Sequence, residues 1–537
     1  MVGAIVASPK TRGGIWCRRV VAALMSLCYL ALAFAPPTNT EAAFGDAAVA
    51  LAGEAVDARI AYFADVQDNA LTHAYVISGL RRLGLATLGL PVATAPSLIG
   101  VVLAFIAIKL LLSRLGGGHR SWLAIVVASC SPLVAFLGTR AWPDSLASGL
   151  VVLGLSLSVC CGKPHTGRRA PLWASAVMMI AGCVLKPNLV TLICALLVVA
   201  VVMHRAVPTG SWALASAALL GAVTAIGAWS VLVEQPVLSS VGVNTDEASL
   251  ISRILDLVRI EVGDVCVTFA RYHAYLALLL LPTVVTAWPL LARRPSCRSS
   301  VIRLAVGAVM GATYWIFTKG RPTGELDFGR IISSEVTEVL EALGVGVGVA
   351  TLPLFVRQTI QRRVGWIWIL VEIPIALQSV VRPTQRYLLP SLLLGIVGVM
   401  AAVPGGEGDA VSVRRRRWQP SVFAAAGVTA STAWALIGLA FVVSQGRASE
   451  QIWRHADQLG IVKSTGFGPV EVHVGYRATL GDGSCFEVVQ VEAGVDPGPA
   501  VAVAPMRVVG RLVRQYVLRP VAKHSQACPD VPLVRGR

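Results

Sequence analysis

Thirteen long apolar segments constrain this chain more than any other feature, because a membrane-spanning helix needs about 20 mostly apolar residues. They lie near residues 20–36, 96–113, 121–138, 145–161, 171–186, 188–203, 212–233, 273–292, 301–318, 336–356, 365–382, 387–403 and 420–443. Only 14% of the residues are charged, against about 25% in a soluble globular protein. The sequence therefore predicts an all-α polytopic membrane protein with about 13 spans. It excludes a soluble enzyme, a disordered tail protein and a DNA-binding module with a basic face.

The first apolar segment allows two interpretations. It is too long, and too poorly followed by small residues, for a clear signal peptide, although Ala33-Phe34-Ala35 resembles a cleavage site. We interpret it as a retained span, with residues 1–19 as a cytoplasmic N-terminus.

The distribution of basic residues predicts the orientation. With the N-terminus in the cytoplasm, the short cytoplasmic segments together carry 21 Lys and Arg residues and only two acids, Glu407 and Asp409. All seven of these segments are basic, as the positive-inside rule requires. The net charge of +17 therefore reflects orientation in the cytoplasmic (inner) membrane and not a nucleic-acid partner.

Thirteen spans place the C-terminus outside the cell membrane. The transmembrane domain is expected at 20–443 and a small extracytoplasmic α+β appendage at 444–537. Within the appendage, Val470–Leu480 alternates like a strand, a Gly-Asp-Gly turn follows, and Cys485–Val491 fits its partner. A Cys485–Cys528 disulfide suits an oxidising compartment. Large outward loops are expected at 37–95, 235–272 and 319–335.

The first outward loop is the richest in polar residues. It ends in a stretch from Asp68 to Leu83 whose apolar positions have helical spacing, which predicts a helix lying on the membrane surface. Asp68 precedes this helix. Such an acid either caps the helix and complements its dipole, or serves the chemistry of a site.

Three short outward turns carry cations. They contain Arg140-Ala141-Trp142-Pro143-Asp144, Lys186-Pro187-Asn188, and Arg382 to Pro390 with Arg386-Tyr387 at its centre. Each cation could simply snorkel to the interface, where charge is less costly than at the membrane centre. However, all three turns are on the same side as the acidic loop. Cations facing an acid at one membrane surface suit an anionic lipid headgroup approached by a nucleophile.

The order of these motifs resembles the GT-C superfamily of integral-membrane glycosyltransferases. The motifs are an acid in the first outward loop, a helix ending in Gly, a second span led by Pro96, an Arg-x-x-Pro-Asp turn, a Lys-Pro turn and Arg-Tyr-Leu-Leu-Pro. The branch that looks most similar contains the bacterial protein-mannosyltransferases and aminoarabinose-transferase-like enzymes. The resemblance covers roughly residues 15–443.

The resemblance implies a glycosyltransferase that moves a sugar from a polyprenyl-phosphate donor to an acceptor at the outer face of the membrane. A carboxylate in the first loop acts as general base, and Asp68 matches it best. Family members usually have Asp-Glu at this position, and here Asn69 replaces the Glu. Asp65 is therefore an alternative candidate for the general base, and Asp46 is a further one. One base opposite the leaving phosphate implies inversion.

The same resemblance assigns roles to the three turns. Arg386 and Tyr387 match the Arg-Tyr motif that lies near the donor phosphate. Lys186 and Arg140 are the other candidates for stabilising the departing phosphate, with Asp144 as a supporting residue. The expected partners are the lipid-linked sugar donor, a lipid, glycan or protein acceptor, and membrane lipids, without nucleic acid.

Other features favour alternatives less strongly. No His, Cys or Asp cluster has metal-ligand spacing, so we expect no cofactor and no protein-ligated metal, with a loosely bound divalent cation as the open alternative. Glu372 lies inside a span, and an intramembrane acid is a functional candidate by default. A transporter or flippase, and a non-catalytic envelope scaffold, are the competing classes. The absence of internal repeats argues against a transporter.

Overall fold

The computed structural model describes thirteen stretches of the chain. They are residues 12–34, 70–85, 91–161, 170–202, 211–234, 262–288, 297–319, 334–380, 385–403, 419–458, 477–479, 485–508 and 511–520. The chain divides into two compact units, one of Met1–Leu30 with Pro96–Ala435 and one of Ala31–Ala95 with Leu436–Arg537. Each unit is described by itself.

Helices lie in every segment that the sequence predicts to be apolar and spanning. The helices are α2 (Arg12–Ala33), α6 (Ala95–Arg114), α7 (Ser121–Ser129), α8 (Pro132–Thr139), α9 (Pro143–Cys161), α10 (Ala170–Leu185), α11 (Val190–Val202), α12 (Ser211–Trp229), α15 (Val262–Ala287), α16 (Cys297–Thr318), α17 (Ser334–Gln361), α18 (Trp366–Gln378), α19 (Leu389–Ala402) and α21 (Gln419–Gln458). The expectation of a predominantly helical chain is confirmed.

The expected number of thirteen spans is not confirmed. Among the described residues, six helices are long and apolar enough to cross a membrane, or seven if the bent pair α7 and α8 counts as one span. Several expected spans, including α10, α11, α18 and α19, form shorter apolar helices of 10 to 17 residues. Polar turns such as Lys186-Pro187 end these helices early, because proline lacks the N–H that would continue the helix.

One expected span is broken in the middle. The helices α7 and α8 meet at a bend of 71°. Pro132 begins α8, and Ser131 before it is extended, with φ −68° and ψ 131°, because the proline ring disfavours the helical conformation of the preceding residue. The bend re-aims α8, whose C-terminal end leads directly into the turn at Arg140.

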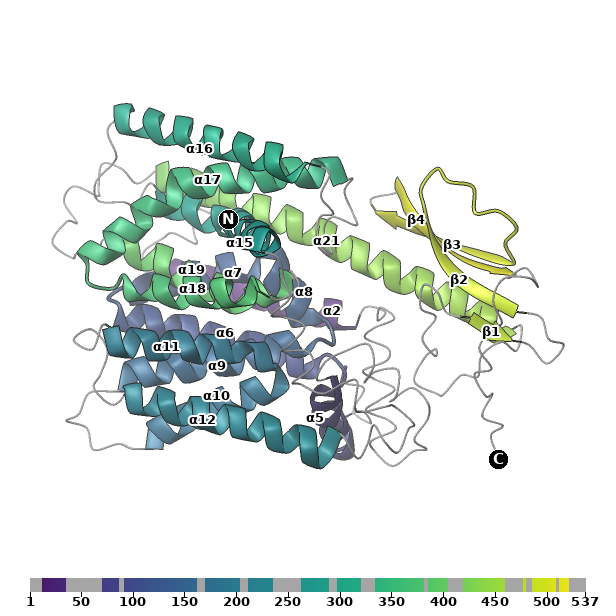
Figure 1. Cartoon of the computed structure of the whole chain (residues 1–537), viewed down its shortest axis with the longest axis horizontal. Helices are drawn as coiled ribbons and strands as arrows, with labels where there is room; N and C mark the ends of the chain where they lie inside the picture. The colour runs from purple at the N-terminus through teal and green to yellow at the C-terminus, as the bar shows by residue number, and fades with distance from the viewer. Residues whose placement is uncertain are drawn as a thin grey trace. The chain divides into compact units, whose positions relative to one another are not determined.

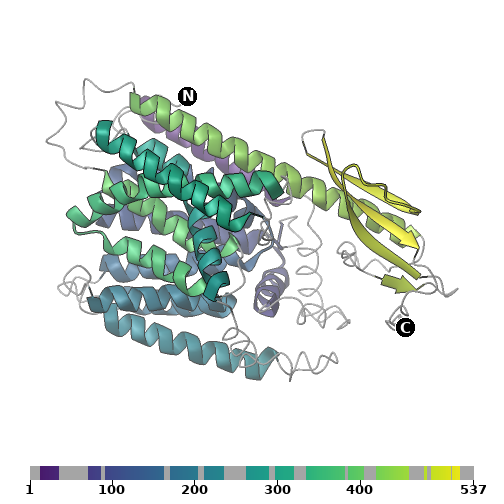
Figure 2. The same cartoon turned by 45° about the horizontal axis from the view of Figure 1, so that its top comes forward.

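The helices of the first unit pack in a continuous series. Neighbouring pairs include α9 with α10, α10 with α12, α11 with α12 and α18, α18 with α19, and α17 with α15 and α16 (Figure 1). The turned view keeps α11 and α12 side by side (Figure 2). Every residue of α19 is buried, as expected of a helix that is apolar all round.

The outer helices expose apolar side chains instead. On α12, Leu220 and Val223 are exposed, and on α16 Leu304 and Phe317 are exposed. A soluble protein rarely leaves such continuous apolar surface open to water. With the spanning helices, this surface defines the chain as a multi-pass membrane protein, although the type of membrane and the sides of the termini stay predictions.

Two arginines hold one end of the central helix α19. Arg120 donates from Nη1 to the carbonyl oxygens of Met400 and Val403, and Arg362 donates to those of Ala401 and Val403. The last carbonyls of a helix have no partner within the helix, and cations complement its negative end. The sequence assigned both arginines to the cytoplasmic side, and both lie at the end of α19 opposite to Arg386.

The helix α15 begins earlier than the sequence predicts. It starts at Val262 and not near 273, and it contains Asp264, Cys266, Arg271 and His273. These residues were expected in, or at the edge of, an outward loop. The apolar runs of the sequence did not reveal this part of the helix, because its polar side chains interrupt the apolar positions.

In the second unit, α5 (Ala70–Arg82) confirms the helix expected after Asp68. Its buried side differs from the expected one, because His73, Ala74, Ile77 and Ser78 are buried while Leu83 is exposed. The apolar residues that led to a membrane-surface helix are therefore not the ones that this helix buries.

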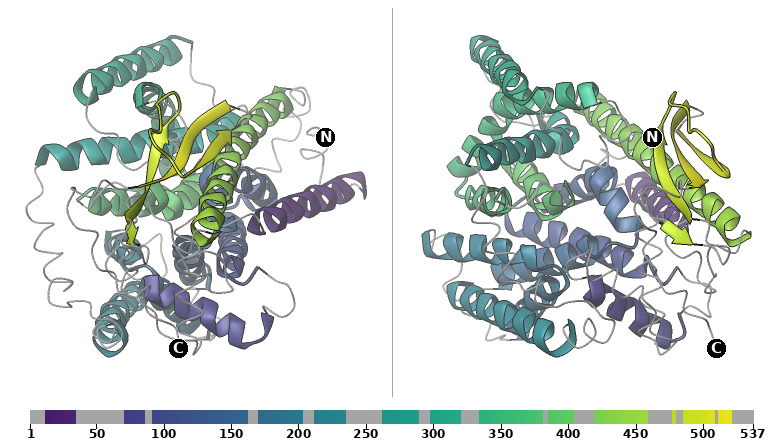
Figure 3. Two further views of the ribbon diagram at one scale, coloured as in Figure 1. Left: turned by 90° about the vertical axis from the view of Figure 1, so that its right-hand side faces the viewer. Right: turned by 45° about the vertical axis from the view of Figure 1, so that its right-hand side comes forward.

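The C-terminal part of the second unit is a four-stranded antiparallel sheet of order β1-β2-β4-β3 (Figure 3). The strands are β1 (Arg477–Thr479), β2 (Cys485–Glu492), β3 (Ala502–Val508) and β4 (Arg511–Pro520). β1 pairs with β2, so the predicted hairpin is confirmed, while β3 and β4 were not expected. Ser444 of α21 accepts a hydrogen bond from the backbone of Arg507. Cys528 lies outside the described residues, so the expected disulfide stays a prediction.

Candidate functional site

The structure brings together three turns that are far apart in the sequence. Lys186 lies 3.5 Å from Asp144 between Nζ and Oδ1, and its ammonium lies 5.2 Å from the ring centre of Tyr387. Trp142, Asp144, Lys186, Arg386 and Tyr387 are called the Lys186 cluster below. The sequence placed these turns on one side of the membrane, but it did not show that they touch.

Arg386 lies between two aromatic rings. Its guanidinium is 4.6 Å from the ring centre of Trp142 and 5.9 Å from that of Tyr387. Stacking on aromatic faces holds a guanidinium in place without using its N–H donors. Its Nε is buried and has no hydrogen-bond partner among the described residues. Since buried donors nearly always have an acceptor, this N–H group is a candidate contact for an anionic ligand.

Lys186 lies in the turn between α10 and α11, outside both helices. Burial lowers the pKa of Lys186 to about 8, Asp144 opposes this shift, and Arg386 adds to it. An additional anion would stabilise the charged form of such a buried ammonium group. The cluster thus contains a cation whose charge one carboxylate balances only in part.

Serine hydroxyls hold the turn at Trp142 against the start of α6. Ser97 donates to the carbonyl oxygen of Trp142, and Ser145 donates to that of Ser97, each at 2.9 Å. The helices α6 and α9 approach closely at Gly100 and Gly149, where any Cβ would collide with backbone atoms of the other helix. This close approach fixes the turn that carries Asp144.

Of the remaining predicted site residues, the structure describes Arg140 but not the three candidate bases. Arg140 is almost fully buried and comes from the same turn as Trp142 and Asp144. Asp46, Asp65 and Asp68, the candidate bases, lie outside the described residues, so their placement stays a prediction. Trp142 was not predicted as a site residue, although it stands inside the Arg-x-x-Pro-Asp motif.

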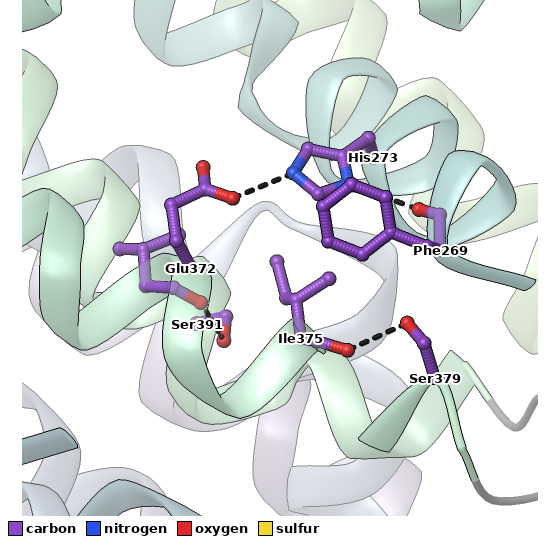
Figure 4. Close-up of polar contacts among 7 residues, drawn as sticks. Phe269, His273, Glu372, Ile375, Ser379 and Ser391 are labelled. Atoms are coloured by element: carbon purple, nitrogen blue, oxygen red, sulfur yellow. Dashed lines mark hydrogen bonds and ion pairs between the residues drawn. The ribbon is translucent and has the colours of Figure 1, made fainter. Parts of the chain in front are cut away.

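A second polar pair lies between α15 and α18. His273 Nε2 lies 2.7 Å from a carboxylate oxygen of Glu372, and His273 Nδ1 lies 2.9 Å from the carbonyl oxygen of Phe269 (Figure 4). The sequence singled out Glu372 but not its partner. His273 was hidden because the helix α15 was expected to begin there.

A third group is enclosed between α15, α16 and α17. Glu341 accepts hydrogen bonds from Tyr275 and Tyr314, and Arg271 lies 3.5 Å from it. Glu341 is fully buried. Its partners come from two other helices, which spacing along one helix cannot reveal. This closed network leaves no exposed carboxylate and fits a structural role.

No group of three or more metal-ligating side chains occurs in the part of the chain that the structure describes. The fold and the Lys186 cluster define a multi-pass membrane protein with a cationic, aromatic-lined turn cluster at one end of its helices. Comparison of the chain with protein-family models, curated protein sequences and solved structures found no match.

Proposed function

We propose that this protein is a membrane glycosyltransferase of GT-C type, which uses a polyprenyl-phosphate sugar donor. The observation that carries the proposal is the Lys186 cluster, above all the buried Nε of Arg386 that has no partner among the described residues. Guanidinium groups suit phosphate oxygens, and aromatic rings suit the adjoining lipid chain.

The charge of the cluster is consistent with this reaction. Lys186 and Arg386 oppose the single carboxylate of Asp144, which leaves one positive charge in excess. A sugar phosphodiester carries one negative charge, and the released polyprenyl phosphate carries about 1.5 to 2. The cluster therefore stabilises the product-like transition state more than the bound donor, which is the requirement for catalysis.

In the proposed reaction, Asp68 takes the proton of an acceptor hydroxyl while the oxygen of that hydroxyl bonds to the anomeric carbon of the sugar. The bond from that carbon to the phosphate oxygen breaks, and the electron pair leaves with the polyprenyl phosphate. The configuration at the anomeric carbon is inverted. The sorted charges of the sequence favour the outer face of the membrane as the place of reaction.

Two variants test the proposal in membranes supplied with a polyprenyl-phosphate sugar. Asp68→Asn is expected to abolish transfer while the protein still retains the donor, since it removes only the base. Arg386→Gln is expected to weaken donor retention about tenfold or more. Arg357→Gln, an exposed arginine on α17, is the matched control. Full transfer by the Asp68→Asn variant excludes this base.

A transporter or flippase is the second candidate, and one observation favours it. The bend between α7 and α8 is a broken span, a feature that transporters use to build binding sites within the membrane. Saturable counterflow of a substrate without covalent transfer of a sugar would establish this alternative.

A further inference from the structure

Glu372 combines an exposed side chain with a place in the middle of the apolar helix α18, whereas Asp264 is exposed in the first turn of α15. The side chain of Glu372 is 47% exposed. By contrast, Asp144 is almost fully buried beside Lys186, and Glu341 is enclosed by its partners. A carboxylate on a spanning element almost never faces hydrocarbon and faces instead a cavity that contains water or a ligand. The exposure of Glu372 therefore indicates an opening at this point.

His273 holds this carboxylate in one orientation. Its Nδ1 lies beside the carbonyl oxygen of Phe269 and therefore carries a hydrogen. One proton is then shared between Nε2 and the near oxygen of Glu372, which makes the pair neutral as a whole. Figure 4 shows the second carboxylate oxygen of Glu372 pointing away from His273. That oxygen is the one available to accept further hydrogen bonds.

An aromatic ring completes the opening. Phe269 packs on the ring of His273 with centroids 4.3 Å apart, and it is 39% exposed. A fixed acceptor oxygen beside an open aromatic face is a combination that suits a sugar. Its hydroxyls donate hydrogen bonds to the carboxylate, and its C–H face packs on the ring.

The helix α18 connects the opening with the turn that carries Lys186. Gln378, at the end of α18, donates to Thr191, whose hydroxyl donates to the carbonyl oxygen of Asn188 in the Lys186 turn. Glu372 stands six residues before Gln378 on the same helix, which is about 9 Å along the helix axis.

We infer that Glu372, His273 and Phe269 form the subsite that binds the hydroxyls and the ring of the transferred sugar. Glu372 and Phe269 contact the sugar, and His273 is a positioning residue that acts through Glu372. This inference rests on the proposed function. Because the His273–Glu372 pair is neutral as a whole, the subsite suits a neutral polyhydroxy sugar and not an amino sugar, whose ammonium group would require an unbalanced carboxylate.

The test measures binding and not turnover. The full chain in lipid nanodiscs is titrated with undecaprenyl phosphate, and then with undecaprenyl phosphate carrying mannose, glucose, arabinose or aminoarabinose. The wild type is expected to bind one neutral-sugar conjugate more tightly than undecaprenyl phosphate alone. Glu372→Gln and Phe269→Ala are each expected to remove most of that preference, about tenfold for Glu372→Gln. Affinity for undecaprenyl phosphate itself is expected to remain unchanged.

Glu450→Gln, an exposed acid on α21 paired with Arg454, is the matched control and is expected to keep the preference. Phe269→Ala keeps the test valid if Glu372→Gln fails to fold. If both variants keep the wild-type preference, or if the wild type prefers no neutral-sugar conjugate, the inference is wrong and the proposed function stands. If the wild type does not bind undecaprenyl phosphate, both are overturned.

Discussion

At the scale of single residues, the environment of Lys186 has a consequence for the pH dependence of ligand binding. Burial lowers the pKa of Lys186 to about 8, so the ammonium is charged below that pH and loses its charge above it. If Lys186 binds the donor phosphate, affinity for undecaprenyl phosphate falls as the pH rises through about 8. The expected loss is about tenfold, as for a charge-assisted hydrogen bond.

Lys186→Arg is the matched variant, because a guanidinium stays protonated throughout this range. Its affinity for undecaprenyl phosphate is expected to be nearly independent of pH between 7 and about 9.5. Binding measured in nanodiscs at a series of pH values checks the prediction. A decline of equal size in the Lys186→Arg variant would assign the pH dependence to another group.

Glu341 is the residue whose loss should cost the most stability. Glu341→Ala leaves Arg271 buried without its carboxylate and removes the acceptor of Tyr275 and Tyr314. Breaking a buried ion pair from one side costs about 3–5 kcal/mol, which a denaturant titration of the purified protein can detect. Tyr314→Phe removes one hydrogen bond and should cost only about 1 kcal/mol. Equal costs for the two variants would contradict the network.

The sequence identified four residues of the Lys186 cluster because short turn motifs contain them. Lys186, Asp144, Arg386 and Tyr387 belong to short turns that contain proline, and local pattern was enough to select them. His273 stands in the middle of a helix. Its significance depends on a contact with Glu372, 99 residues away, and no local pattern carries that information.

At the scale of helices, hydropathy located the elements well but located their ends less well. A run of apolar residues marks the part of a helix that lies in hydrocarbon. It says little about a helix that continues through polar residues, as α15 does from Val262. It also cannot distinguish one straight span from two helices that meet at Pro132, because hydropathy does not register the loss of one N–H group.

Close packing of α6 on α9 gives a prediction at this scale. A methyl group added at Gly100 would collide with the backbone at Ser145, while one added at Gly227 of α12 meets no atom within 4 Å. Gly100→Ala is expected to destabilise the protein by about 1–3 kcal/mol through overpacking. Gly227→Ala is expected to be neutral or to stabilise by up to about 1 kcal/mol, since alanine favours the helix.

Thermal unfolding of both glycine variants, followed by circular dichroism, checks this difference. Since the turn with Trp142 and Asp144 follows directly on this contact, Gly100→Ala should also weaken undecaprenyl phosphate binding. Wild-type stability in the Gly100→Ala variant would mean that α6 and α9 are farther apart than the structure has them.

At the scale of the whole chain, the distribution of charge predicts the orientation in the membrane, which helix packing does not. The described structure separates Arg120 and Arg362 at one end of α19 from Arg386 at the other. This agrees with the sorting of cations by side that the sequence predicts. It does not show which end faces the cytoplasm, because helix packing is the same in either orientation.

Reporter fusions to the full-length protein decide the orientation. Alkaline phosphatase folds only after export, so an insertion between Gly405 and Gly406 is expected to be inactive and a fusion after Arg537 active. By the positive-inside rule, the basic run Arg414–Arg417 is expected to keep the first position in the cytoplasm. Replacing these four arginines by glutamine is therefore expected to lower the activity of the C-terminal fusion. High activity of the Gly405 insertion in the wild type would reverse the orientation, and the Lys186 cluster would then face the cytoplasm, where a nucleotide-activated sugar could replace the lipid-linked donor.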